Sequence, residues 1–331
     1  MHAMEIGNMQ EWNAIVEEFG AHPMQQWQWG ALKEATGPWT ATRISLSEGD
    51  ELVGGAQVLT RSMPFPFRAI CYLPRGPFAR EGRLMDVANA VADWCKANTK
   101  AVSVKIDPAV SELDFGEGWE PSERVLIRKT VVKDLTIDED TLMKSIPNRK
   151  CRQYIRKAKR DGVEVRPGAE ADLPGIYALY TKTAEEDGFP IHEEEFYTQA
   201  FHLLEGSQQL FVAEQEGDLQ AFLWNITSPR GTTFELWGAV SETGKRSRAN
   251  YYLKWHAMLA AKELGAVTYD LNGLLNDGIS DFKLLFEREP TLWVETHDRP
   301  LSPLYHAMNK ALEIRRHHNT RDNAQEDTSE E

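Results

Sequence analysis

The sequence QLFVAEQEGDLQAFLWNI, residues 209–226, consists of two apolar, β-prone runs around a polar turn that contains Gly217. This pattern predicts a β-hairpin. A third strand is expected at 232–239, and an amphipathic helix follows at 250–264. Another short strand is expected at 267–271. The second half of the chain therefore predicts antiparallel strands, a crossover helix and a returning strand, which is a mixed α/β unit.

The first half of the chain repeats this order of elements. Two helices precede the strands in each half, at 8–19 and 25–35 and again at 172–185 and 193–204. The further expected elements of the first half are strands at 40–46, 51–61 and 68–73, a helix over 84–95 and a strand at 102–106. No sequence repeat accompanies the repeated order. It is the order of acetyltransferase-like (GNAT) domains, so the predicted architecture is two such domains in tandem.

The predicted domain limits follow from this order. The first domain covers residues 1–140 and the second covers 141–298. A helix over 299–318, with an apolar stripe, is expected to pack back on the first domain. The tail 319–331 is acidic and has no large apolar side chain, so we expect it to be disordered.

Composition excludes several classes of protein. The chain has 331 residues, 41% of them apolar, which excludes global disorder. A formal net charge of −14 argues against a DNA-binding surface and requires any RNA contact to be local. The three cysteines lack metal-ligand spacing, so no metal is expected. No signal peptide or membrane span is predicted, which indicates a cytoplasmic protein and leaves peripheral membrane contact open.

The segment 269–286 holds the strongest candidate for chemistry. A predicted strand ends in a glycine-bearing polar turn, and a short helix then carries Lys283 between Phe282 and Leu284. Ligands of α/β sheets bind beyond the carboxyl ends of strands. The spacing alone is consistent with two interpretations of Lys283. It is either a surface lysine that snorkels or a lysine at an active site.

Several motifs resemble the Fem family (FemABX) of non-ribosomal peptidyl transferases. Gln26–Gly30 with Lys33 resembles the family's opening motif, and Leu73–Pro77 resembles its proline-rich turn. The C-terminal pattern is matched by Tyr251, Leu253, Trp255, Ala261, Lys262, Gly265, Tyr269, Asp270, Gly273, Gly278, Ile279, Phe282, Lys283 and Phe286. The motifs span both predicted domains in the family's order. Jointly they are specific, whereas each alone would be weak.

The resemblance assigns roles to particular residues. It implies that Phe282 and Lys283 lie at the active site and that Lys33 contacts the muramyl substrate. Asp107 follows a predicted strand where the family carries a carboxylate, which makes it a candidate base or a structural residue. Further expected substrate contacts are Arg75, which equally suits a purely architectural turn, Trp237 and Tyr251.

The sequence also departs from the family pattern. Glu186 stands where the family usually shows an arginine, so a diphosphate would be held differently. Glu287 and Arg288 replace the glycines that commonly follow Phe286. No long heptad segment interrupts the second domain, which predicts the compact type without a helical arm.

A basic segment at 148–166 stands out in this acidic chain. Arg152, Arg156 and Lys159 belong to it, with Tyr154 among them. A solvated helix and a contact with the tRNA backbone are both consistent with this density of charge.

The resemblance implies an aminoacyltransferase that moves an amino acid from aminoacyl-tRNA to the stem peptide of a peptidoglycan precursor. The acceptor is expected to be UDP-MurNAc-pentapeptide or a lipid-linked precursor, and no cofactor is expected. An acyl-CoA N-acyltransferase is the first alternative, but the loop 241–250 has one glycine and does not fit the usual phosphate loop. A non-catalytic precursor-binding protein is the second. The transferred amino acid and the oligomeric state are left open.

Overall fold

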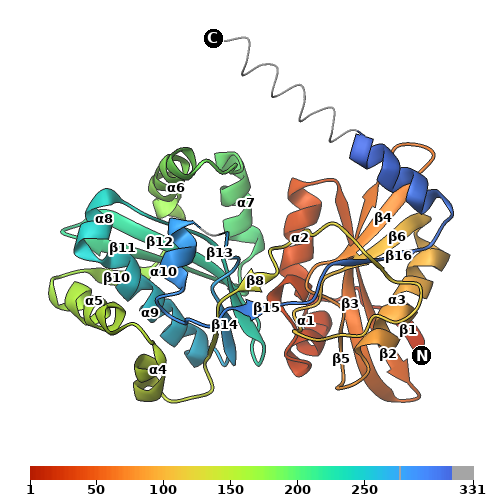
Figure 1. The fold of residues 1–331 in the computed structure, drawn as a ribbon, viewed down its shortest axis with the longest axis horizontal. Helices are drawn as coiled ribbons and strands as arrows, with labels where there is room; N and C mark the ends of the chain where they lie inside the picture. The colour runs from red at the N-terminus through yellow and green to blue at the C-terminus, as the bar shows by residue number, and fades with distance from the viewer. Residues whose placement is uncertain (276, 315–331) are drawn as a thin grey trace, which may run out of the picture.

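A computed structural model describes residues 1–275 and 277–314. In it the chain forms two α/β halves that lie side by side, with the segments β8 and β15 between them (Figure 1). The expected end of the last helix at 315–318 and the expected disordered tail at 319–331 lie outside the described residues. No helix among the described residues is long and apolar enough to cross a membrane.

The first half is built on one mixed sheet. Among the described residues its strand order is β1-β2-β3-β4-β6-β16-β7, with β5 paired to β3. Strands β4 and β6 are parallel, and their neighbours are antiparallel. The bounds are β1 His2–Glu5, β2 Trp39–Glu48, β3 Glu51–Ser62, β4 Ala69–Leu73, β5 Phe78–Ala79, β6 Ala101–Ile106, β7 Glu120–Pro121 and β16 His297–Pro300.

Helices cover this sheet. Helix α3 packs an apolar face that includes Val87, Val91 and Cys95 on strands β2, β3 and β6. The others precede β2, and the bounds are α1 Met9–Glu18, η1 Pro23–Gln25, α2 Trp27–Thr36 and α3 Leu84–Asn98. The predicted elements of this half are present at the expected places.

The second half repeats the plan with its own sheet. The order is β10-β11-β12-β13-β14-β9, in which β13 and β14 are parallel. The bounds are β9 Val132–Asp134, β10 Glu164–Pro167, β11 Gln208–Gln215, β12 Asp218–Thr227, β13 Thr232–Val240 and β14 Thr268–Asp270. The predicted hairpin at 209–226 is confirmed as β11 and β12.

The helices of the second half lie around this sheet (Figure 1). Their bounds are α4 Glu139–Ser145, α5 Arg149–Arg160, η2 Glu170–Asp172, α6 Leu173–Asp187, α7 Glu194–Leu203, α8 Glu242–Ser247, α9 Ala249–Glu263 and α10 Gly278–Lys283. Helix α9 is the crossover between β13 and β14, as α3 is between β4 and β6. The fold is therefore two GNAT-like domains in tandem, as predicted.

The chain passes between the two sheets at two points. Strand β9, which precedes residue 140, pairs with β14 of the second sheet. Near the end of the chain β15, Thr291–Leu292, pairs with β8, Lys129–Thr130, and β16 then returns to the first sheet beside β6. The domain limits drawn at 140 and 298 stay a prediction, and the pairing shows strands exchanged across both.

The last described helix, residues 304–314, packs on the first half. Tyr305 and Met308 are buried against Val102 of β6, with Phe67 and Ile70 beside them. The Tyr305 hydroxyl also donates a hydrogen bond to the buried Asp298 carboxylate at 3.0 Å. These contacts confirm that the C-terminal helix returns to the first domain.

The two halves share a hydrophobic core. Met24, Trp29 and Leu32 of the first half are buried in one cluster with Leu210 and Trp224 of the second. Burial of large side chains on both sides makes sliding of the halves costly. The relative position of the two sheets is therefore fixed by packing as well as by the crossing strands.

Candidate active site

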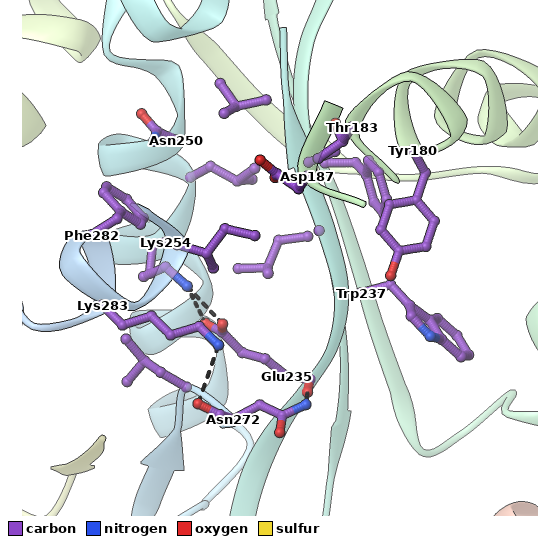
Figure 2. Close-up of a pocket in the computed structure, with 18 of the residues that line it drawn as sticks. Tyr180, Thr183, Asp187, Glu235, Trp237, Asn250, Lys254, Asn272, Phe282 and Lys283 are labelled. Atoms are coloured by element: carbon purple, nitrogen blue, oxygen red, sulfur yellow. Dashed lines mark hydrogen bonds and ion pairs between the residues drawn. The ribbon is translucent and has the colours of Figure 1, made fainter. Parts of the chain in front are cut away.

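A pocket opens where two neighbouring strands of the second sheet separate. Strands β13 and β14 pair only over Thr232–Phe234 and Thr268–Asp270. Beyond this point β13 continues to Val240, and its residues form one wall of a pocket of about 490 Å³. Side chains of α6, α9 and α10 form the other walls (Figure 2). The pocket thus lies beyond the carboxyl end of a strand, where α/β sheets bind ligands.

Lys283 is the last residue of α10 and lines this pocket. The helix begins at a capped turn, in which the Asp277 carboxylate accepts a hydrogen bond from the Ser280 amide at 2.7 Å. At its other end the Lys283 Nζ donates to the carbonyls of Asn272 at 3.2 Å and Gly273 at 2.9 Å. An ammonium has three N–H donors, so one remains for a ligand in the pocket.

The turn that presents these carbonyls is built from Asp270 to Gly273. Asn272 has a φ of 60°, a conformation that asparagine tolerates better than most residues. Its amide donates to Asp270 at 2.8 Å and its side chain donates to the Glu235 carbonyl at 2.9 Å. A Cβ at Gly273 would lie 2.4 Å from a side-chain carbon of Ile127, so only glycine fits. The polar turn that the sequence singled out therefore positions Lys283.

Burial lowers the pKa of Lys283 to about 8. Desolvation is the main cause, because it disfavours the charged ammonium. The nearby carboxylate of Glu235 raises this pKa and the cation of Lys254 lowers it. Lys283 is therefore not an exposed, snorkelling lysine, which was one of the two interpretations of the sequence. It is largely enclosed, and its lowered pKa makes its charge sensitive to mildly alkaline pH.

A buried ion pair that was not predicted from the sequence lies beside Lys283. The Lys254 Nζ lies 2.7 Å from Glu235 Oε2, and each side chain is 7% exposed (Figure 2). Lys254 shares the buried face of α9 with Ala257 and Ala261. A lysine at helical spacing with buried alanines was the signal in the sequence that could have identified it.

Phe282 and Tyr251 pack against each other. Their ring centroids are 4.9 Å apart in an edge-to-face arrangement. Phe282 lines the pocket, and Tyr251 supports it from behind together with the buried Phe286. Ile279 also lines the pocket and is 39% exposed there, so it does not face the core.

The outer part of the pocket is aromatic and acidic. Trp237 of β13 lines it, packed edge-on against Tyr197 of α7. Glu186 is exposed at the end of α6 and also lines the pocket, 3.8 Å from the Lys182 Nζ. The carboxylate that departs from the family pattern is thus partly neutralised, and it remains accessible.

The second departure from the family pattern, Glu287, pairs with a buried lysine. Glu287 forms a salt bridge at 3.0 Å with Lys133, whose side chain is 3% exposed on β9. A buried lysine needs a compensating charge or hydrogen bonds. Glu287 therefore occupies the position of the family's glycine with a stabilising role for β9.

Asp107 and Arg75 lie together in the first half, outside the pocket of Lys283. Asp107 is 2% exposed and accepts hydrogen bonds from the Tyr72 hydroxyl and the Arg75 amide, both at 2.8 Å. Burial raises the pKa of Asp107 to about 6, which the Arg75 cation opposes. Arg75 also donates to the Ile127 carbonyl at 3.0 Å. These contacts hold the proline-rich turn against the connection between the two sheets.

Lys33 lies in a second pocket, of about 650 Å³, in the first half. Its Nζ lies 4.5 Å from the centroid of the Trp29 ring, which is a cation–π contact. Burial lowers the pKa of Lys33. The C-terminal helix closes one side of this pocket through Tyr305 and Met308.

The basic segment is helix α5. Its Arg156 and Lys159 are exposed, whereas Arg152 is half-buried and donates to the Ile146 carbonyl. The Lys159 Nζ lies 5.9 Å from the ring centroid of Tyr252 on α9. Helix α5 therefore packs beside α9, the helix that carries Lys254.

Both halves of the chain match known sequence families, and the chain has named relatives. Residues 9–124 match the FemAB family, and residues 148–284 match the acetyltransferase (GNAT) domain. A lipid II:glycine glycyltransferase of Staphylococcus epidermidis is 24% identical over 405 aligned positions, covering 94% of this chain and 95% of the relative. One of Staphylococcus aureus is 28% identical over 240 positions, covering 65% and 55%. The longer of these alignments exceeds the 331 residues of this chain, so that relative carries inserted segments.

Solved structures share the fold. A crystal structure of FemX has a TM-score of 0.81 at 22% identity, covering 93% of this chain and 99% of that one. The structure of L-PGS from Bacillus licheniformis has a TM-score of 0.53 at 14% identity, covering 94% and 98%.

The tandem GNAT-like fold places a lysine-bearing pocket at the strand ends of the second domain. The family matches and the relatives then identify the class of protein. The chain belongs to the Fem family, and it is an enzyme of the aminoacyltransferase class.

Proposed function

We propose that this protein transfers an aminoacyl group from aminoacyl-tRNA to an amine of a peptidoglycan stem peptide. In this reaction the neutral amine attacks the ester carbonyl and forms a tetrahedral intermediate. The C–O bond to the tRNA ribose then breaks, an amide remains, and the proton of the amine leaves with the ribose hydroxyl. The ester is already activated, so the reaction requires neither a metal nor a covalent enzyme intermediate.

The proposal rests mainly on the arrangement of Lys283. Its ammonium is anchored by the Asn272 and Gly273 carbonyls and retains a free donor toward the pocket. A cation fixed in a desolvated site stabilises the oxyanion of a tetrahedral intermediate without reorganisation. Phe282 and Trp237 line the same pocket and give apolar surface for the substrate.

The acceptor is proposed to be a peptidoglycan precursor because the named relatives are lipid II:glycine glycyltransferases. Lys33 and Trp29 are proposed to contact it from the second pocket. A cation beside an indole suits a sugar linked to phosphate, because the ammonium can pair with the phosphate and the indole can stack on the sugar. We expect the nucleotide-linked or lipid-linked muramyl part to bind there.

Donor binding is proposed for helix α5. Arg156 and Lys159 are exposed cations, and Arg152 lies beside them. The chain has a net charge of −14, so phosphates are expected to bind this local group of cations in preference to the rest of the surface. Its position beside α9 would bring a bound tRNA end near the pocket.

Asp107, Arg75 and Tyr251 are proposed to position rather than to react. Asp107 and Arg75 bond to each other and to the turn between the sheets. Tyr251 holds the ring of Phe282. Each would act by fixing a group that touches substrate.

An acyl-CoA donor is the alternative, favoured by the match of residues 148–284 to the acetyltransferase domain. Such enzymes hold pyrophosphate on a glycine-rich loop before the crossover helix. Here that loop is replaced by helix α8, and Arg248 precedes α9 with a φ of 65°. This disfavours a pyrophosphate cradle of that type.

One transfer assay tests the proposal and the alternative. The purified protein is incubated with a pool of charged tRNA or with acetyl-CoA, and with nucleotide-linked or lipid-linked precursor as acceptor. Mass spectrometry of the acceptor should show the added mass of one amino acid with charged tRNA only. Acetylation, or no product with either acceptor, would contradict the proposal.

A further inference from the structure

The loop between β3 and β4 exposes an aromatic side chain on an apolar segment. Residues 63–67 read Met-Pro-Phe-Pro-Phe and contain no polar side chain. Phe65 at the tip is 89% exposed, although phenylalanine is among the residues most often buried. Water contact with so large an apolar surface is unfavourable, so a partner that covers it would gain free energy.

The base of this loop is held rigidly. The Met63 amide donates to the Arg68 carbonyl at 2.7 Å, and the Phe67 amide donates to the Pro64 carbonyl at 2.9 Å. Met63 and Phe67 pack against the C-terminal helix beside Tyr305. Phe65 therefore projects from a fixed support.

Four cations lie at the same end of the sheet. Arg61 and Arg68 flank the loop, and the register places Ala69 of β4 opposite Ala101 of β6. The exposed Lys100 therefore lies at the same edge as Arg68, and the exposed Lys96 is in the last turn of the helix that leads there.

These cations lack carboxylate partners within the parts of the chain that are described. None of Arg61, Arg68, Lys96 and Lys100 forms a salt bridge there. Two other arginines of the first half do form salt bridges, Arg80 with Glu18 and Arg83 with Glu48. Acidic side chains in this region are Asp93, one turn before Lys96, and Glu123 and Glu313, which line the second pocket together with Arg61.

We propose that this edge of the first domain docks on the surface of an anionic lipid bilayer, with Phe65 inserted at the interface. Aromatic rings favour the boundary between headgroups and acyl chains. Each arginine or lysine near an anionic surface adds about 1 kcal/mol of attraction at physiological salt. An apolar tip and exposed cations at the same edge of the sheet are the two features that such a surface recognises.

The second pocket lies next to the loop that is proposed to dock. Arg61 and Ile70, at the base of the loop, also line the pocket that contains Lys33. A protein docked by Phe65 would hold this pocket close to the bilayer, where a lipid-linked acceptor presents its headgroup. This step rests on the proposed function, whereas the docking itself does not.

Vesicle binding without any substrate tests the docking. The full chain is sedimented with vesicles of phosphatidylglycerol and phosphatidylcholine, or of phosphatidylcholine alone, at low and high salt. Binding is expected only with the anionic vesicles, and it should weaken at high salt. Phe65→Ser should reduce the partition constant by about tenfold, and the pair Arg68→Glu with Lys100→Glu by at least as much.

Matched controls carry the same changes elsewhere. Leu264→Ser alters a side chain that is 54% exposed at the end of α9, and the pair Lys129→Glu with Lys144→Glu reverses two exposed charges on β8 and α4. Both should bind vesicles like the unchanged protein. Equal binding by Phe65→Ser and Leu264→Ser, or no binding to anionic vesicles, would overturn the docking proposal.

A second readout separates this inference from the proposed function. Phe65→Ser should retain transfer to the soluble nucleotide-linked acceptor, because Phe65 lies outside both pockets. With the lipid-linked acceptor in vesicles its rate should fall about tenfold, in step with binding. Loss of transfer to the soluble acceptor as well would contradict the assigned role of Phe65. Vesicle binding without transfer by any variant would remove the proposed function and leave the docking intact.

Discussion

Lys254 and Glu235 form a salt bridge at the inner wall of the pocket, with the ammonium in contact with both carboxylate oxygens and each side chain 7% exposed. One residue comes from helix α9 and the other from strand β13, so the pair joins the crossover helix to the strand that forms the wall. Glu235 also accepts a hydrogen bond from the Asn272 side chain through its backbone carbonyl. The pair thus connects the helix, the strand and the turn that anchors Lys283.

Removal of one partner of this pair should destabilise the protein more than removal of both. Lys254→Met leaves a buried carboxylate without its partner, which typically costs about 3–5 kcal/mol. The double variant Lys254→Met with Glu235→Gln removes both charges and should recover much of that loss. Chemical denaturation of the two single variants and the double variant measures the coupling. Additive losses would mean that the two charges do not interact.

Lys283→Met should reduce transfer without unfolding the protein. One lost oxyanion partner typically lowers kcat by about 10²–10³-fold, and burial of a methionine in an apolar frame costs little stability. Transfer kinetics and a thermal melt of the same preparation give both quantities. Lys144→Met on the exposed face of α4 is the control for the loss of a lysine charge. A folded Lys283→Met protein with an unchanged rate would exclude Lys283 from the reaction.

The pH dependence of transfer provides a separate test of the charge on Lys283. Burial lowers its pKa to about 8, so the ammonium is present below this pH and is lost as pH rises through it. The rate should therefore fall above about pH 8, even though the acceptor amine becomes more nucleophilic. Lys283→Arg keeps a charge at all accessible pH values. Its profile should lack this alkaline limb, and an identical limb in both proteins would assign it to another group.

Much of the fold could be predicted because local signals agree with it. Apolar alternation and a glycine turn mark the β11–β12 hairpin, and helical spacing marks α9. The exchanged strand β16 could not be predicted, because the pairing of His297–Pro300 with the first sheet depends on contacts far along the chain. Strand pairing across domains leaves no local pattern.

The candidate site could likewise be predicted only in part. Lys283 and Phe282 were predicted from a motif, and the structure brings them into one pocket with Trp237. The Lys254–Glu235 pair was missed because its partners are 19 residues apart. The helical spacing of Lys254 with buried alanines marks it as buried, but no local pattern connects it to Glu235. Asp107 resembled a catalytic base by position, while its bonds to Tyr72 and Arg75 become apparent only in three dimensions.

The basic face of α5 should determine the salt dependence of tRNA binding. Changing Arg152, Arg156 and Lys159 to alanine removes phosphate partners, so affinity should fall and the slope of log K against log salt should flatten by about 0.9 for each lost contact. Filter binding over a salt series measures it. Because Arg152 also bonds the Ile146 carbonyl, the double variant Arg156→Ala with Lys159→Ala separates binding from folding. Exposed Lys129, Lys144 and Lys310, changed together, are the control, and equal slopes in all proteins would contradict a phosphate-binding role of α5.

Glu186 should influence the choice between the two acceptors. It is exposed at the pocket wall, and its only described ion pair is with Lys182 at 3.8 Å. A carboxylate repels a diphosphate that comes near it, so the unchanged protein should favour an acceptor whose diphosphate lies elsewhere, such as a lipid-linked precursor at the membrane. Glu186→Arg supplies a guanidinium that pairs with phosphate in bidentate fashion.

The measured quantity is the ratio of kcat/KM for the nucleotide-linked and lipid-linked acceptors. We expect Glu186→Arg to shift this ratio toward the nucleotide-linked acceptor by about tenfold, the equivalent of about 1.4 kcal/mol. Glu185→Arg makes the same change of charge one residue earlier, on a side chain that is exposed and does not line the pocket. It should leave the ratio close to that of the unchanged protein, because charges separated by water are screened. If the two variants gave the same ratio, net charge alone would account for the effect, and Glu186 would lie outside the acceptor site.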